Sequence, residues 1–189
     1  MEELLKLKKV LPFLLPLIIN FMIIMLILIV CLSSSGESSV MAGTFFRKPF
    51  KEDVHYNVTS YFGLREDPFD NSIIKYHSGI DLSAPDGTEI LSIGDGIVVE
   101  VGNNPSTLGN YVYIKHNYEN ITYYSVYGHM LNDSIRVIKN QVVKSGDIIG
   151  IIGSTGRSTG THLHLTLMSP IISFDKNYLV DPQFVIEGL

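Results

Sequence analysis

The sequence predicts a mainly β domain with antiparallel sheets, preceded by one N-terminal transmembrane helix. Two observations indicate the β domain. From residue 55 onward, short segments rich in β-branched and aromatic residues alternate with turns of Gly, Asn, Asp and Pro. No long stretch of this region repeats its apolar residues at the helical period. A third observation, a long apolar run before residue 33, indicates the membrane helix.

The N-terminal part of the chain predicts a membrane anchor. Residues 10–32 are apolar except for Asn20, and a helix of this length crosses the roughly 30 Å of hydrocarbon in a bilayer. A cleaved signal peptide has a shorter apolar region, so an uncleaved signal anchor is favoured. Residues 1–9 carry three lysines and two glutamates. We expect this tail to stay in the cytoplasm, with everything after Ser33 outside.

A linker, residues 33–54, joins the anchor to the predicted extracytoplasmic domain, residues 55–189. The linker begins with seven residues of only Ser, Gly and Glu, a composition typical of flexible spacers. Its remainder, residues 40–54, has no pattern that predicts an element.

Composition and charge exclude several classes of protein. Cys31 is the only cysteine, so the chain can form neither an internal disulfide nor a cysteine-based zinc cluster. Any stabilising metal must therefore bind to histidines and carboxylates. The formal net charge is −5, and the acidic excess lies after the N-terminal tail, which argues against a nucleic-acid binder.

Strands are predicted along the whole domain by their β-rich composition and flanking turns. They cover residues 57–62, 89–92, 96–102, 110–116, 122–128, 141–143, 148–153 and 162–168. Residues 94–102 and 145–153 resemble each other in sequence, which indicates a duplicated hairpin unit.

The chemistry is concentrated in the histidines. His162 and His164 are two apart in a predicted strand, so their side chains point to the same face. His77 and Asp81 stand upstream in one short motif. Two imidazoles and a carboxylate make a zinc site with a fourth position for water. Bound zinc lowers the pKa of this water to about 7. Such a site polarises a carbonyl for hydrolysis, and a further histidine such as His129 can move protons. Spacing alone leaves open which member of the 162/164 pair binds the metal.

Four motifs in this order resemble those of the lysostaphin and LytM-type peptidoglycan endopeptidases. They are TSYFGLR at 59–65, HSGID at 77–81, YGHM at 127–130 and GSTGRSTGTHLH at 153–164. The similarity extends over residues 57–182. The resemblance implies an antiparallel β-sandwich or open barrel, the duplicated hybrid motif. It also implies a zinc metalloendopeptidase that hydrolyses peptide bonds in the cross-links or stem peptides of the bacterial cell wall.

The resemblance also assigns roles to the histidines. His77, Asp81 and His164 are expected to hold one zinc ion. His129 and His162 are expected to stand beside the metal as catalytic imidazoles.

Further cleft residues follow from the same resemblance. Arg65 matches an arginine that recurs in the first motif of the family, where it orders the cleft or contacts substrate. A tyrosine lines the cleft in some relatives, and three candidates are present that the sequence does not separate: Tyr61, Tyr76 and Tyr127.

Some positions depart from the family pattern or match no motif. After the histidine pair, relatives commonly have Phe-Glu, whereas this chain has Leu165 and Thr166. Neither position is a ligand, so the change is expected to alter only local packing and polarity. His55 and His116 match no motif and are interpreted as ordinary surface residues.

Two other functions use some of the same residues. A catalytically silent, zinc-binding scaffold would act as a docking protein at the envelope, as relatives that have lost ligands do; here every ligand position is filled. A glucose-type enzyme IIA phosphocarrier has a stretch similar to residues 77–81 but lacks the 162/164 pair, and its phosphoryl donor is cytosolic. The sequence therefore favours an active hydrolase, a single-pass membrane protein that acts on peptidoglycan peptides.

Overall fold

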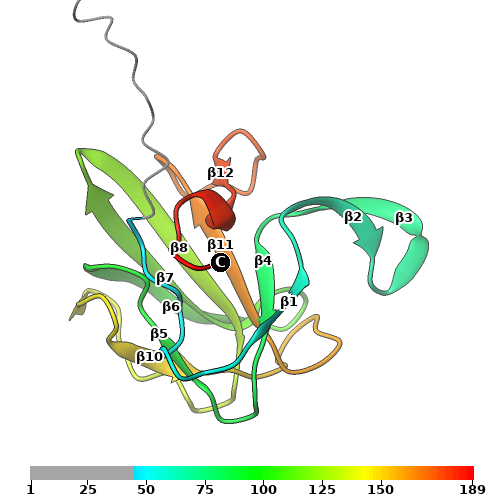
Figure 1. The fold of residues 1–189 in the computed structure, drawn as a ribbon, viewed down its shortest axis with the longest axis horizontal. Helices are drawn as coiled ribbons and strands as arrows, with labels where there is room; N and C mark the ends of the chain where they lie inside the picture. The colour runs from blue at the N-terminus through cyan, green and yellow to red at the C-terminus, as the bar shows by residue number, and fades with distance from the viewer. Residues whose placement is uncertain (1–44) are drawn as a thin grey trace, which may run out of the picture. The chain divides into compact units, whose positions relative to one another are not determined.

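The computed structural model describes residues 45–189 (Figure 1). The predicted cytoplasmic tail, the anchor at 10–32 and the linker up to residue 44 lie outside the described residues. Within residues 45–189, no helix is long and apolar enough to cross a membrane. This part of the chain consists of strands, turns and one short 3₁₀ helix, η1 (Pro182–Phe184).

The described strands form one large sheet and two separate ribbons. Across the large sheet the order is β1 (Asn57–Ser60), β4 (Ile80–Ser83), β11 (Leu163–Met168), β8 (Ile121–Met130), β7 (Gly109–Tyr118), β6 (Gly96–Asn104) and β9 (Val142–Val143), with β12 (Leu179–Val180) paired to β11. The ribbons are β5 (Glu89–Leu91) with β10 (Ile148–Ile151), and β2 (Gly63–Asp67) with β3 (Asp70–His77). Every pairing between these strands is antiparallel, so the prediction of a mainly β domain with antiparallel sheets is confirmed.

Strand β11 divides the hydrophobic core from the polar face of the sheet. Leu163, Leu165 and Leu167 are fully buried in the main core cluster. His164 and Thr166 alternate with them and therefore point to the other face. The alternation predicted from the sequence is thus present, and it turns the histidine away from the core.

The folded domain begins before residue 55. Phe46 and Phe50, which the sequence analysis assigned to the linker, are buried in the core with 4 % and 0 % of their surface exposed. The backbone carbonyl of Phe46 accepts a hydrogen bond from Glu187 near the C-terminus. The domain boundary at 54/55 was therefore wrong for residues 45–54. Phe46 and Phe50 fill the core although they follow no strand or helix periodicity.

Gly79 allows β4 and β11 to lie close together. A Cβ atom at this position would be 2.3 Å from the carbonyl oxygen of Leu165, which is too short for a contact between non-bonded atoms. The glycine of the HSGID motif is therefore required by packing. The resulting register places Asp81 directly opposite His164.

His116 is buried, so its interpretation as a surface residue was wrong. Only 1 % of its surface is exposed. Its Nδ1 donates a hydrogen bond of 2.8 Å to the carbonyl of Asp95, and its Nε2 lies 2.7 Å from the Ser125 hydroxyl. Because two polar partners satisfy the neutral ring, the residue is tolerated inside the sheet. Burial lowers the pKa of His116 to about 4.

This buried imidazole predicts a pH-dependent loss of stability. The folded-state pKa of about 4 lies below the unfolded value of 6.5, so the unfolded chain binds more protons between these values. The contribution of neutral His116 to the free energy of unfolding should be fully present above pH 6.5. As the pH falls toward 4, the free energy of unfolding should decrease by up to about 3 kcal/mol because of this residue. Urea unfolding of the native protein and of His116→Gln at several pH values isolates this contribution. Equal pH slopes in the two proteins would contradict the prediction.

Candidate active site

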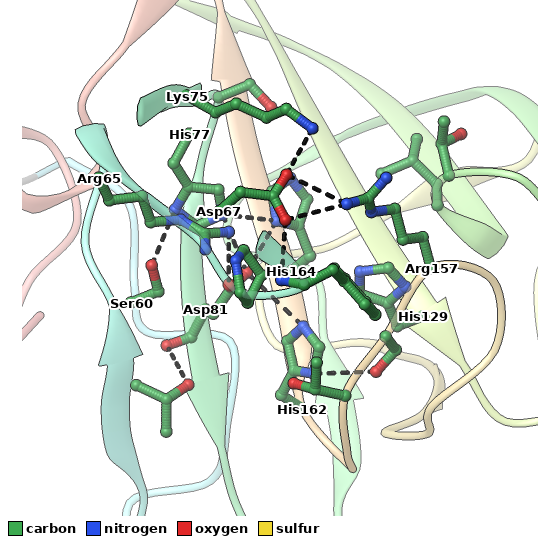
Figure 2. A pocket seen from close by; sticks show the side chains of 18 of the residues that line it. Ser60, Arg65, Asp67, Lys75, His77, Asp81, His129, Arg157, His162 and His164 are labelled. Atoms are coloured by element: carbon green, nitrogen blue, oxygen red, sulfur yellow. Dashed lines mark hydrogen bonds and ion pairs between the residues drawn. The ribbon is translucent and has the colours of Figure 1, made fainter. Parts of the chain in front are cut away.

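The three side chains predicted to bind metal meet where β3, β4 and β11 come together (Figure 2). His77 Nε2 is 3.1 Å from both Asp81 Oδ1 and His164 Nδ1. Asp81 Oδ1 is 2.8 Å from His164 Nδ1. Each of the three residues is at least nine-tenths buried.

This donor set fits a zinc ion. Ligands of a tetrahedral zinc site are roughly 3.3 Å from one another at ordinary zinc–ligand distances, close to the separations seen here. Two imidazole nitrogens and one carboxylate oxygen are suitable zinc ligands, and three protein ligands leave one coordination position for water or substrate. The arrangement is therefore that of a catalytic rather than a closed structural site.

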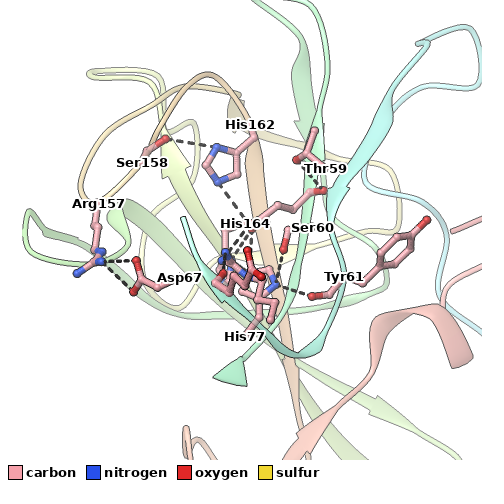
Figure 3. A network of polar contacts seen from close by, with 12 residues as sticks. Thr59, Ser60, Tyr61, Asp67, His77, Arg157, Ser158, His162 and His164 are labelled. Carbon is pink, nitrogen blue, oxygen red and sulfur yellow. Dashed lines mark hydrogen bonds and ion pairs between the residues drawn. The ribbon is translucent and has the colours of Figure 1, made fainter. Parts of the chain in front are cut away.

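The second nitrogen of each ligand histidine has its own polar partner. His77 Nδ1 is 2.8 Å from the backbone carbonyl of Tyr61 (Figure 3). A carbonyl only accepts, so Nδ1 carries the proton and Nε2 presents its lone pair to the site. His164 Nε2 is 2.8 Å from Thr166 Oγ1, which can accept the ring proton and leave Nδ1 to bind the metal. Partners of this kind orient metal-binding imidazoles.

Asp81 is held in its charged form. Burial opposes ionisation, but the close polar contacts with the rings of His164 and His77 keep the pKa of Asp81 well below its usual value. Arg65 Nη2 lies 3.7 Å from Asp81 Oδ2, the oxygen that does not face both histidines. Arg65 therefore lies in the site, as predicted, and contacts a candidate ligand.

His129 and His162 lie beside the ligand set. Their ring centroids are 4.6 Å apart, and the His129 ring is 5.8 Å from that of His164. His162 Nε2 is 3.7 Å from Asp81 Oδ1. The structure thus brings together all five residues that the resemblance assigned to the site.

Both of these imidazoles are oriented by the backbone. His129 Nδ1 donates to the carbonyl of Thr155 at 2.7 Å, and His162 Nδ1 donates to that of Gly160 at 2.8 Å. Each neutral ring therefore has an unprotonated Nε2 that can accept a proton. Burial lowers the pKa of His129 to about 4, which keeps it a neutral base at physiological pH. His129 also has a φ of 60°, a left-handed conformation that is uncommon for residues other than glycine and is often found at functional sites.

These residues lie in a cleft of about 1150 Å³. Of the three candidate tyrosines, Tyr76 lines the cleft. Tyr61 contributes its backbone carbonyl to His77, while its side chain is 57 % exposed and is not part of the lining. The prediction for Tyr127 was wrong: its side chain is fully buried in the core, where its hydroxyl accepts a hydrogen bond from the Ile93 amide.

Sequence reasoning missed several residues of the cleft wall. Tyr111 and Tyr113 line it from β7, and their alternate spacing in a predicted strand was the only available signal. Asp67 and Arg157 also line it and form an ion pair with each other. They are 90 positions apart, so no local pattern could have linked them.

Thr166 has a larger role than the expected change in local packing. It is fully buried, and its hydroxyl is the partner of His164 Nε2. The sequence identified this position as a departure from the family pattern but not as a contact of the ligand histidine.

An antiparallel β fold that carries this ligand set and two further histidines in one cleft defines a metallopeptidase of the lysostaphin type. The chain belongs to peptidase family M23, whose family model matches residues 75–182. The resemblance inferred from the four motifs is thereby confirmed.

Individual relatives agree with this assignment. The chain is 34 % identical over 142 residues to the peptidoglycan DD-endopeptidase ShyB of Vibrio cholerae, covering 72 % of this chain and 32 % of that protein. Among solved structures, a zinc-containing peptidase from Vibrio cholerae matches with a TM-score of 0.60 and 35 % identity, over 74 % of this chain and 39 % of that one. The catalytic domain of lysostaphin from Staphylococcus simulans matches with a TM-score of 0.58 and 29 % identity, over 68 % and 90 %. The chain thus spans about a third of the curated relative that it matches.

The contact between Thr166 and His164 predicts a change in metal affinity. Thr166→Val keeps the shape of the side chain but leaves the His164 ring without its second partner, so zinc affinity should fall by about 10- to 100-fold. Competition with a chromogenic chelator measures this loss. Thr122→Val is the control, because among residues 45–189 that hydroxyl bonds only the side chain of Asn117. Equal zinc affinity in Thr166→Val and the native protein would contradict the role.

Proposed function

We propose that this chain is a membrane-anchored zinc metalloendopeptidase that hydrolyses peptide bonds in the cross-links or stem peptides of bacterial peptidoglycan. The observation that carries the proposal is the complete set of His77, Asp81 and His164 with His129 and His162 beside it in one cleft. Membership of family M23 and the name of the Vibrio cholerae endopeptidase support the choice of substrate.

Zinc is the metal that we assign to the site. A zinc ion there acts as a Lewis acid that lowers the pKa of water and polarises the carbonyl of the bond to be cleaved. His77, Asp81 and His164 would hold the ion, with both rings oriented by acceptors on Tyr61 and Thr166. The match to a zinc-containing peptidase supports this choice over other metals.

His129 and His162 would move the protons of the reaction. Peptide hydrolysis needs a base that takes a proton from the attacking water and an acid that gives one to the departing amine. Each of these imidazoles has an unprotonated Nε2 in its neutral form, and each is locked in orientation by a backbone carbonyl. The low pKa of His129 keeps its ring unprotonated at neutral pH, which is the form that can accept a proton. Arg65 would restrain Asp81 through Oδ2, the oxygen that the two ligand histidines do not contact.

The placement of the domain is also proposed. Residues 10–32 would anchor the chain in the cell membrane, with residues 1–9 in the cytoplasm and the peptidase outside, where its substrate lies. The three lysines before an uncharged apolar run support this orientation. For the fold, we propose the duplicated hybrid motif in its sandwich or open-barrel form. The similar sequences of 94–102 and 145–153, which include most of β6 and all of β10, support that assignment.

Metal binding should depend on the three proposed ligands. Metal analysis after dialysis against zinc-free buffer should find about one zinc per chain, falling sharply in His77→Ala, Asp81→Ala and His164→Ala. His162→Ala is the matched control for His164→Ala, because the two histidines are two residues apart, and it should keep its zinc. Zinc content that survives substitution of both His77 and Asp81 would contradict the assignment.

Catalysis should depend on the two remaining histidines without loss of metal. His129→Ala and His162→Ala should retain zinc yet digest purified walls about 10²- to 10⁴-fold more slowly, the usual contribution of a positioned acid or base. His55→Ala, an exposed histidine outside the cleft, should cleave at the native rate. Mass spectrometry of the fragments identifies the bond.

Two outcomes would count against the proposal. Native rates in both variants would remove the assigned roles. A native protein that holds zinc but cleaves no wall type would favour the silent-scaffold alternative.

The topology can be tested on intact protoplasts. Because the positive tail precedes the apolar run, added protease should remove the domain after Ser33 and spare residues 1–9. Immunoblotting with tags at each end records the result. Full protection of the C-terminal tag would reverse the proposed orientation.

A further inference from the structure

The β2–β3 hairpin is attached differently from the rest of the domain. Its two strands pair with each other and with no other strand of the described residues. Every residue of β3 before His77 is exposed. Figure 1 shows the hairpin extending away from the main sheet. Hydrophobic burial therefore does little to hold it in place, although it forms one wall of the cleft.

Asp67, at the end of β2, is buried although the residues of β3 before His77 are exposed. Only 2 % of its surface is exposed, and its carboxylate accepts from three residues. Lys75 of the hairpin is one, and the Phe69 amide is another at 2.8 Å. The third is Arg157, whose Nη2 lies 3.0 and 3.1 Å from the two carboxylate oxygens (Figure 2).

Arg157 also packs on the hairpin through its flat face. Its guanidinium carbon lies 4.3 Å from the centre of the Phe69 ring, a cation–π contact. Arg157 thus contacts the hairpin tip twice, once by charge and once by stacking. Figure 3 shows this ion pair beside the histidine cluster.

The loop that carries Arg157 is anchored to the opposite wall. The Arg157 amide donates a 2.8 Å hydrogen bond to the carbonyl of Thr107. Gly156 has a φ of 73° and packs so tightly that a Cβ would lie 2.2 Å from the Gly109 amide. The next residue, Ser158, places its hydroxyl 3.3 Å from His162 Nδ1. The ion pair therefore joins the hairpin to a firmly held loop that also contacts His162.

We propose that Asp67 and Arg157 form a clasp that ties the two walls of the cleft together and positions the β2–β3 hairpin for substrate binding. Both are positioning residues in the proposed peptidase reaction, on which this inference rests. The clasp replaces the apolar contacts that the hairpin lacks. Asp67 is a buried carboxylate with two cationic partners, and loss of either partner would leave its charge incompletely compensated. The arrangement in which both ion pairs are formed is therefore strongly favoured. Arg157 reaches both carboxylate oxygens through Nη2 while its flat guanidinium stacks on Phe69, a combination that a lysine ammonium cannot reproduce.

The test compares variants of the full chain. Asp67→Asn and Arg157→Gln remove the charge from either side of the clasp, and Arg157→Lys keeps the charge but loses the flat guanidinium that stacks on Phe69. The matched control is Arg136→Gln. Arg136 forms an ion pair with Glu89 at the same 3.0 Å and with nearly the same side-chain exposure, 48 % against 47 %, but lies outside the cleft lining.

Amide hydrogen exchange measures whether the clasp holds the β2–β3 hairpin in place, and it does not depend on enzymatic activity. In Asp67→Asn and Arg157→Gln, the amides of β2 and β3 should exchange about tenfold faster or more, while those of β8 and β11 stay at native rates. Arg136→Gln should leave β2 and β3 unchanged. Native exchange in the hairpin would overturn the proposal. Equally faster exchange in β8 and β11 would also overturn it, because the pair would then be a general stabiliser.

Kinetics on a soluble peptide substrate test positioning. The clasp variants should lose about tenfold or more in kcat/KM, mainly through a higher KM, with zinc content unchanged and Arg157→Lys intermediate. Native KM values, or a loss of zinc, would overturn the role. If the native protein cleaves no substrate, the proposed function fails, while hydrogen exchange still decides whether the clasp holds the hairpin.

Discussion

The close antiparallel pairing of β4 with β11 is the contact on which the site depends. It sets Asp81 opposite His164, two residues 83 positions apart in the chain. The pairing is possible because Gly79 has no side chain to meet the backbone at Leu165. A shift by one residue would turn His164 toward the core and a leucine toward the cleft. The candidate metal site is therefore a direct consequence of strand register.

The same strand shows how the core supports the chemistry. Leu163 and Leu165 are packed without exposure on one side of β11, while His164 and Thr166 face the site. A close-packed interior resists deformation, so side chains on the other face of a core strand hold their positions well. Hydrogen bonds then orient each ring. The histidines on the loops and strand ends rely on backbone carbonyls, and His164 relies on a threonine hydroxyl.

The two sides of the cleft are stabilised by different forces. The sheet side rests on buried apolar side chains, whereas the β2–β3 hairpin is mostly exposed and meets the rest of the domain through polar contacts. Hydrophobic packing gives a rigid base for the ligands on β4 and β11. A charged contact depends on both partners, so removal of either one weakens the hold on this wall.

By itself, the sequence determined the antiparallel β class and the common face of His162 and His164, because both follow from short-range periodicity. The motif resemblance, rather than spacing, separated ligand from catalytic histidine. Only the tertiary structure decided which polar residues are buried. It placed Tyr127 in the core instead of the cleft, buried His116 with partners, and drew residues 45–54 into the domain. These outcomes depend on contacts between segments far apart in the chain, and no local pattern records which distant surface will cover a given side chain.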